Sequence, residues 1–262
     1  MKRSLTKSTI AASLVLSAAI VSQPAMAAPK FKVTIEAPGV QQSKLTNSSS
    51  GATGVFVNNF DSETTGYKSN GLAFAGDSKI GIYDKGDIVA ANQYGGAGGT
   101  GKFLVVQPGQ SGAPATYTQS TLTLTNPQRY FGVWWSAGDK NNELDFFSGN
   151  QLLEKFTTAD VIKLVNNNKS YYGNPNPKFK GQDSGEPFVF VNFFADPTDT
   201  KVTFNKVAFI NKLANPLTGF ETDNQTIARS YQPVPEPSAL LGLGLVAGIG
   251  VFSQKRRILK QA

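Results

Sequence analysis

The stretch Tyr130-Phe-Gly-Val-Trp-Trp-Ser136 is apolar on both faces of an extended chain, which is typical of a strand at the centre of a sheet. Around it, apolar residues recur with a period of two far more often than with the helical period of 3.6, and turn residues follow at short intervals. The segment 116–125 alternates threonine with larger side chains, which gives one buried and one solvated face. The sequence therefore predicts an all-β domain.

Outward from 130–136, the same pattern predicts about ten strands and one short helix. The helix is expected at 157–165, with Thr158 as its cap and Val161, Ile162 and Val165 on one face. Short turns, with no repeat and no internal linker, indicate a single antiparallel β-sandwich of jelly-roll, lectin-like character over residues 28–231. The other expected strands are 31–35, 53–57, 79–83, 102–106, 116–125, 142–147, 151–156, 188–194 and 202–210.

Residues 1–27 form a predicted secretory signal peptide. Lys2, Arg3 and Lys7 precede an apolar stretch at 10–21, and the small residues Ala25-Met-Ala27 follow it. A basic start, an apolar centre and an A-x-A cleavage site are the three parts of such a signal. We therefore expect the domain to be exported.

The C-terminal segment 232–262 has a three-part order of its own. Pro235-Glu-Pro237 precedes an apolar run at 239–252, and a basic cluster that includes Arg256 and Arg257 follows. A helix over 239–252 would span roughly 21 Å of a hydrocarbon core of about 30 Å, and its basic end would stay in the cytoplasm. Two alternatives fit this pattern: a transmembrane sorting helix that is removed by cleavage, and a plain anchor that is never cut.

This order resembles the PEP-CTERM sorting tail of bacterial exported proteins. The resemblance implies that the tail holds the chain in the inner membrane while an exosortase-type membrane transpeptidase cuts near Pro235, Glu236 and Pro237. The mature domain is similar to a cyanobacterial family of exosortase-dependent surface proteins, which implies localisation at the cell surface or in the extracellular matrix. The motifs that carry this second resemblance are 92–101, 130–139, 171–175, 184–187 and 219–223.

The net charge of +7 belongs to the two ends of the chain rather than to the domain. Seven of the 25 basic residues lie in the signal peptide and the tail, against one of the 18 acidic residues. The domain is therefore nearly neutral, and no basic run with interleaved aromatic residues remains to bind DNA or RNA. The absence of cysteine and histidine excludes disulfides and the usual zinc, copper and iron–sulfur ligand sets. It also excludes Ser-His and Cys-His nucleophiles.

The glycine-rich segment Gly96-Ala-Gly-Gly-Thr-Gly101 matches G-x-G-x-x-G. Phe103 occupies the place where a P-loop needs serine or threonine, and the strand-like sequence that follows offers no helix N-terminus to a phosphate. We therefore expect a loop that packs closely against a neighbouring backbone.

Four aromatic residues are candidates for binding polysaccharide: Trp134, Trp135, Tyr171 and Tyr172. Adjacent residues on a strand face opposite sides of the sheet, so one of the two tryptophans must face outward. An exposed flat ring can stack on a sugar, and Asn174 and Asn176 could bond its hydroxyl groups. The alternative is that loops cap these outward-facing rings.

Acidic residues near turns are candidates for a structural calcium ion, the one cofactor that we considered. Asp84, Asp87 and Asp139 are the best placed, although none has EF-hand spacing. A glycosidase would need two carboxylates that face one cleft. Glu143 and Asp145 share a strand face and Glu186 lies in a loop, so such a pair is not excluded, but nothing in the sequence makes them converge.

The sequence therefore predicts an exported, noncatalytic surface protein. Its expected role is structural or adhesive in the extracellular matrix, with extracellular polysaccharide as a partner. The alternative is a secreted enzyme that processes polysaccharide with its carboxylates.

Overall fold

The computed structural model describes residues 30–48, 52–196 and 198–231. The predicted signal peptide, the sorting motif at Pro235, Glu236 and Pro237, and the apolar run at 239–252 lie outside these residues. Among the described residues, no helix has the length and apolar character needed to span a membrane.

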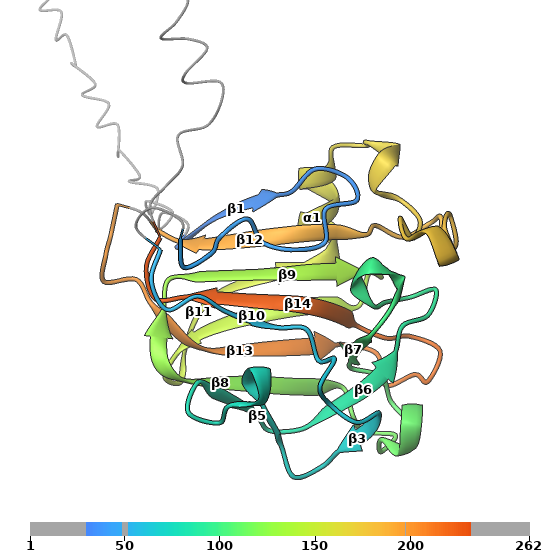
Figure 1. The fold of residues 1–262 in the computed structure, drawn as a ribbon, viewed down its shortest axis with the longest axis horizontal. Coiled ribbons are helices and arrows are strands. Elements are labelled where there is room, and N and C mark those ends of the chain that lie inside the picture. The colour runs from blue at the N-terminus through green and yellow to red at the C-terminus, as the bar shows by residue number, and fades with distance from the viewer. Residues whose placement is uncertain (1–29, 49–51, 197, 232–262) are drawn as a thin grey trace, which may run out of the picture.

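The described chain folds into two antiparallel sheets whose facing sides enclose one main core (Figure 1). This arrangement confirms the prediction of an all-β, sandwich-like domain. The eight-stranded sheet has the order β1 (Phe31–Ile35), β12 (Val189–Ala195), β9 (Tyr130–Ser136), β14 (Glu221–Ala228), β7 (Lys102–Val105), β6 (Gly86–Ala90) and β3 (Gly66–Lys68), with β2 (Phe56–Asn58) paired to β14. The six-stranded sheet has the order β11 (Gln151–Thr157), β10 (Asn142–Ser148), β13 (Phe204–Asn211), β8 (Gln119–Gln128), β5 (Gly81–Tyr83) and β4 (Leu72–Ala73).

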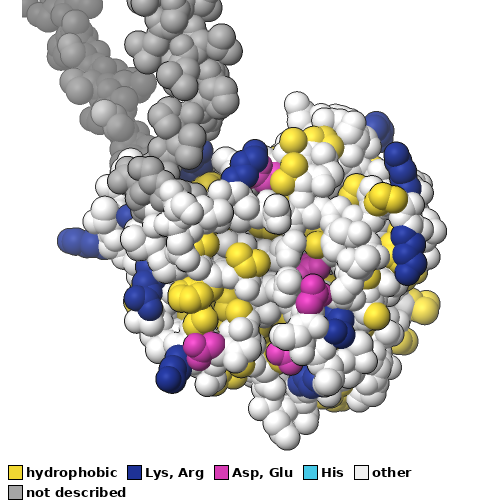
Figure 2. All heavy atoms as spheres, in the orientation of Figure 1, with side chains coloured by type: hydrophobic (Ala, Val, Ile, Leu, Met, Phe, Trp, Pro, Cys, Tyr) yellow, Lys and Arg dark blue, Asp and Glu magenta, His cyan; other side chains and the backbone are white. Residues whose placement is uncertain are grey.

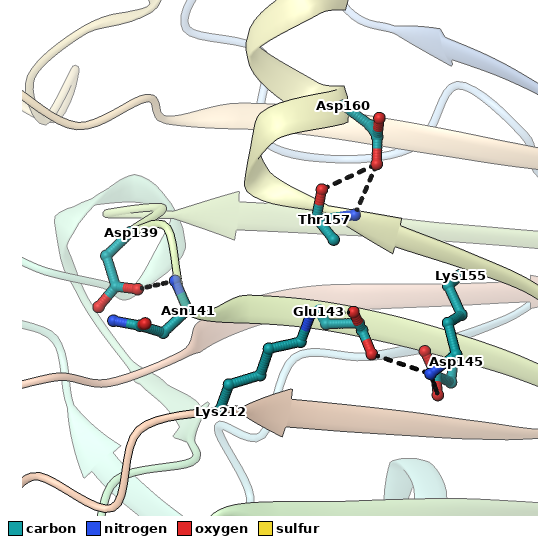
Figure 3. Close-up of polar contacts among 8 residues, drawn as sticks. All are labelled: Asp139, Asn141, Glu143, Asp145, Lys155, Thr157, Asp160 and Lys212. Atoms are coloured by element: carbon teal, nitrogen blue, oxygen red, sulfur yellow. Dashed lines mark hydrogen bonds and ion pairs between the residues drawn. The ribbon is translucent and has the colours of Figure 1, made fainter.

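The helix α1 (Thr158–Val165) confirms the expected helix, with two differences. The cap is Thr157 rather than Thr158, and the Asp160 carboxylate accepts hydrogen bonds from both the backbone N–H and the hydroxyl of Thr157 (Figure 3). Val161 and Val165 are buried, but Ile162 is exposed. The buried face of α1 is therefore narrower than the sequence predicts.

Phenylalanine rings from both sheets meet at the centre of the core. Phe146 on β10 is fully buried, with ring centroids 4.8 Å from Phe31, 5.1 Å from Phe193 and 5.7 Å from Phe131. Its neighbour Phe147 is partly exposed under Lys206. The aromatic pair thus divides between the two faces of its strand, as period-two alternation requires.

The strand β14 is polar in sequence and yet lies in the middle of the eight-stranded sheet, between β9 and β7. Part of its polarity is satisfied between the sheets. The Tyr83 hydroxyl donates to Gln225 Oε1 at 2.7 Å and accepts from Asn58 at 3.1 Å, and Gln225 also donates to the Thr222 hydroxyl. The first residue of β14, Glu221, lies in a different environment at the end of the sheet.

Candidate functional site

The two tryptophans predicted to bind sugar are both fully buried. Trp135 belongs to the main core, while Trp134 lies on the opposite face of β9 and packs with Phe188 and Phe190 beneath Ala97. Apolar side chains form only separate patches in the view of Figure 2. The alternative, rings capped by loops, is therefore the one that the structure shows, and neither tryptophan presents a face to a sugar.

The other members of the predicted sugar site also make internal contacts. Tyr171 is buried, and its hydroxyl donates to the Glu36 carbonyl at 2.8 Å. Tyr172 is partly exposed, with the Lys169 ammonium 5.2 Å from its ring centroid. Because only one of the four rings reaches solvent appreciably, the predicted aromatic platform is not assembled.

The glycine-rich loop covers this part of the eight-stranded sheet. Asn174 and Asn176 are buried and donate side-chain hydrogen bonds to the loop carbonyls of Gln93 and Gly96, at 2.8 and 3.2 Å. A Cβ atom on Gly96 would lie 2.3 Å from that of Ala91, so glycine is required by the close approach of two backbones. The expectation of a packed loop rather than a phosphate cradle is confirmed.

The three predicted calcium ligands do not come together. Asp84 Oδ1 accepts the Thr121 N–H at 2.7 Å, and Asp139 Oδ1 accepts the Asn141 N–H at 2.6 Å in a different loop (Figure 3). Asp87 is fully buried, with no hydrogen-bond partner for either carboxyl oxygen. In the described part of the chain, no three acidic side chains are placed to hold a metal ion.

The outer face of the six-stranded sheet carries a pair of acids clamped by lysines (Figure 3). Lys155 Nζ lies 3.2 Å from Glu143 Oε1 and 3.0 Å from Asp145 Oδ2, and Lys212 also contacts Glu143. Burial opposes the ionisation of Glu143, but the contacts with Lys212 and Lys155 outweigh it and lower the pKa. Burial raises the pKa of Asp145, and Lys155 partly offsets the rise. Two lysines therefore offset the charge of this pair.

A second group of acids lies where β9 ends and β12 and β14 begin, at the right-hand end of the sheets in Figure 1. We call Asp139, Asp183, Glu186 and Glu221 the end cluster. In the described chain, none of the four makes an ion pair with lysine or arginine. The end cluster thus differs from the clamped pair in lacking an ion-paired cation.

Backbone contacts bring the loops of the end cluster together. The Gly138 N–H donates to the Pro187 carbonyl at 3.1 Å, which joins the residues beside Asp139 and Glu186. The buried Asn142 side chain accepts the Asp139 N–H at 2.9 Å and donates to the Gly219 carbonyl at 2.7 Å. Asn142 thereby links the loop of Asp139 to the turn that precedes Glu221.

Burial and mutual repulsion hold protons on this cluster. Burial raises the pKa of Glu221 well above its usual range, and the charges of Glu186, Asp139 and Asp183 raise it further. Burial raises the pKa of Glu186 to about 7, with Asp183 and Asp139 contributing in the same direction. At neutral pH, Glu186 is therefore close to its midpoint, and the equilibrium of Glu221 is shifted toward the protonated form.

Two polar atoms beside the end cluster are left without a partner. Asp183 Oδ2 is buried and accepts no hydrogen bond, and Trp135 Nε1 is buried and donates none. The indole nitrogen lies under the loop of the cluster, 3.0 Å from where a Cβ atom on Gly138 would be. Buried polar atoms almost always have partners, so an unpaired one calls for an explanation, such as a bound water or a role in catalysis.

Comparison with known proteins gives a weak structural likeness. No family model and no curated protein matches the chain. One similar solved structure is a cyclase from Fischerella sp. TAU in complex with 4-(1H-indol-3-yl)butan-2-one, 15% identical, covering 80% of this chain and 94% of that chain with a TM-score of 0.30. Another is the Stig cyclase Fisc from Fischerella sp. TAU in complex with (3Z)-3-(1-methyl-2-pyrrolidinylidene)-3H-indole. It is 13% identical, and the match covers 77% of this chain and 100% of that chain with a TM-score of 0.31.

These findings correct the predicted function. Three of the four rings predicted to bind polysaccharide, Trp134, Trp135 and Tyr171, are buried, so the platform on which an adhesive role depended is absent. The prediction of a structural or adhesive surface protein is therefore wrong. At these TM-scores the likeness transfers no chemistry to this chain, so the function has to be argued from the site itself.

Two members of the end cluster, Asp183 and Glu221, are absent from the sequence prediction. Glu186 was considered only as one half of an unproven pair, and Asp139 only as a calcium ligand. A usable signal existed in Glu221-Thr-Asp-Asn-Gln225, because acids and amides along one strand are unusual in a domain with so few charged residues. The order of strands, which buries this one, was not readable from the sequence.

Proposed function

We propose that this protein is an enzyme that catalyses proton transfer to a small organic substrate, with Glu186 as general acid and Glu221 as a protonated neighbour that limits the negative charge beside it. The observation that carries the proposal is the end cluster: four carboxyl groups gathered at one end of the sandwich without an ion-paired cation. Such a cluster must retain protons at neutral pH, and a donor with a pKa near 7 is well matched to acid catalysis at that pH.

The positions of the two glutamates fit these roles. Glu186 is half-buried, so a substrate can reach it from solvent, whereas Glu221 is only 5% exposed. The Glu186 N–H is bonded to the Asp183 carbonyl at 3.0 Å, and the Gly173 N–H to the Glu186 carbonyl at 3.1 Å, which fixes the backbone of the donor. Backbone fixation on both sides provides the preorganisation that proton transfer needs.

The chemical step needs no redox partner. The Glu186 carboxyl gives its proton to an oxygen or carbon of the substrate, which becomes a cation and is stabilised by the carboxylate that remains. Water then adds to the cation, and the proton that it releases restores Glu186. Glu221, protonated at neutral pH, keeps this part of the site from accumulating further negative charge.

The test is the hydrolysis of 4-nitrophenyl vinyl ether, whose slow step is proton transfer to carbon. The purified protein should accelerate release of 4-nitrophenol, with a rate that is constant below about pH 7 and falls above it, because Glu186 must be protonated. Glu186→Gln should lower the rate by about 100-fold, the usual contribution of a general acid. Asp139→Asn should move the fall to lower pH, because it removes a negative charge that raises the pKa of Glu186.

Glu63→Gln is the matched control, since it removes one carboxylate near β3, at the edge of the sheet remote from β1 and β12. Circular dichroism should show each variant folded. A rate equal to that of buffer alone, or full activity in Glu186→Gln, contradicts the proposal.

Delivery of the domain is a separate proposal that rests on the sequence. We propose that the chain is exported by residues 1–27 and processed by an exosortase-type transpeptidase at Pro235-Glu-Pro237, after anchoring in the inner membrane. The jelly-roll detail of the fold likewise stays a prediction. An unchanged mature mass after Pro235→Ala with Glu236→Ala, measured in the native host, would contradict processing at the motif.

A further inference from the structure

A pocket of about 340 Å³ opens at the edge of the sandwich, between β1 and β12 of one sheet and β11 of the other, beside α1. It lies within the size range of small-molecule sites. Its walls are mainly apolar: Phe31, Val33, Phe156, Val161, Val191 and Phe193. These side chains are part of the main core or pack against it, so the pocket is an open side of the core itself.

Four charged residues also line this edge pocket: Glu154, Lys155, Asp160 and Lys163. Three of them are engaged elsewhere. Lys155 pairs with Glu143 and Asp145 on the outer face, and Lys163 Nζ lies 2.9 Å from Asp160 Oδ1. Asp160 also caps α1.

Glu154 is the exception among these charges. In the described chain, its carboxylate makes neither an ion pair nor a hydrogen bond. Glu154 is partly buried and lines the pocket beside an irregularity of β11, where the register with β10 shifts between Phe146 and Phe147. An apolar pocket with one unpaired negative charge is complementary to an apolar molecule that carries one positive charge.

We propose that the edge pocket binds a small aromatic amine, with the ring against Phe156, Val33 and Leu164, which line the pocket and reach solvent, and the ammonium group on Glu154. The partly exposed Phe156 ring offers a face or an edge to a ligand ring. A cation that enters this partly desolvated site gains more from Glu154 than it would from an exposed carboxylate. This proposal concerns a different end of the molecule from the end cluster and does not depend on the proposed function.

A charged side chain on an edge strand has another known use, which is to prevent pairing between edges of different molecules. If Glu154 has that role, loss of its charge should cause self-association, and the charge should not affect the binding of an amine. The experiment therefore measures both ligand binding and oligomeric state.

The probes are 2-phenylethylamine, its neutral counterpart 2-phenylethanol and its anionic counterpart 3-phenylpropanoate, titrated into the purified protein by calorimetry. The amine should bind about tenfold more tightly than the alcohol, the ratio expected of one partly desolvated ion pair. The anion should not bind measurably. Raising the salt concentration to about 0.5 M should reduce the preference for the amine, because the pocket is open to solvent.

Glu154→Gln keeps the shape of the side chain and should abolish the preference for the amine over the alcohol. Glu154→Lys should reverse the order of the amine and the anion. Leu164 lines the pocket and is exposed, so Leu164→Trp should block all three probes by occupying the pocket. Glu63→Gln serves again as the control for charge. A preference that survives Glu154→Gln, or equal binding of amine and alcohol to the unmodified protein, overturns the proposal. A third outcome also overturns the proposal: the Glu154→Gln variant self-associates, and the unmodified protein shows no preference for the amine. That outcome would mean that Glu154 protects the edge strand from pairing.

Discussion

Lowering the pH from 8 to 5 is expected to stabilise this protein against unfolding, which is the reverse of ordinary acid denaturation. Burial raises the pKa of Asp87 to about 6, of Asp223 to about 7 and of Glu186 to about 7, and it raises that of Glu221 well above the usual range. In each case the folded protein holds a proton that the unfolded chain releases. Such a group contributes stability that is complete below its unfolded pKa, near 4, and that is lost as the pH rises through the folded pKa.

Other carboxyl groups limit the effect at lower pH. The pKa values of Glu143 and Asp160 are lowered by their lysine partners against the effect of burial. Their contribution is present above the unfolded pKa and is lost as the pH falls through the folded one. The free energy of unfolding should therefore be greatest near about pH 5.

The matched variants are Asp87→Asn and Glu221→Gln, compared with Glu63→Gln. Because burial raises the pKa of Asp87 to about 6 against the opposing effects of Ser111 and Lys68, Asp87→Asn should raise the free energy of unfolding by about 2 kcal/mol at pH 8 and leave it unchanged near pH 3.5. Glu221→Gln should reduce the change in the free energy of unfolding between pH 5 and pH 8. Urea unfolding at a series of pH values measures both effects, and a midpoint that falls steadily from pH 8 to pH 5 would contradict them.

Truncation of Phe146 is expected to be the most damaging single change in the core. Phe146→Ala removes a fully buried ring that touches rings from both sheets and should lower the free energy of unfolding by about 3–5 kcal/mol. That is a large part of the 5–15 kcal/mol typical of a domain. The melting temperature should fall by about 10 °C.

Phe147→Ala provides the matched control, because it removes the same ring from the adjacent residue on the partly exposed face. It should cost about 1 kcal/mol or less, since Lys206 is the ring's main partner there. Equal losses for the two variants in thermal unfolding would show that the core is not centred on Phe146.

Period-two alternation predicted most of the architecture. The strands β1 and β9 have the predicted bounds, α1 begins one residue late, and both aromatic pairs on β9 and β10 divide between opposite faces. These elements can be predicted from the local sequence, because an apolar residue at every second position shows by itself which face of the strand is buried. The strand β6 and the central position of β14 were missed, since a polar strand is buried only by neighbours that are distant in sequence.

The site was predicted less well for the same reason. Trp134 and Trp135 were correctly expected on opposite faces, but the loop that covers Trp134 comes from residues near Ala97 and cannot be placed by sequence spacing. The end cluster joins residues from three segments, around 139, 183–186 and 221. Asp139, Glu186 and Glu221 lie in three of the segments on which the predicted family resemblance rests, 130–139, 184–187 and 219–223, but nothing in their spacing shows that they meet.

The central claim is that the end cluster holds protons at neutral pH, and direct titration of its carboxyl groups tests it. The protein labelled with ¹³C at glutamate Cδ is followed by NMR from pH 4 to 9, with Glu186→Gln and Glu221→Gln to assign the two resonances. The account predicts that Glu186 titrates near pH 7 and that Glu221 is still protonated there. If both resonances titrate below about pH 5, like exposed glutamates, the end cluster is an ordinary set of surface acids and the account is contradicted.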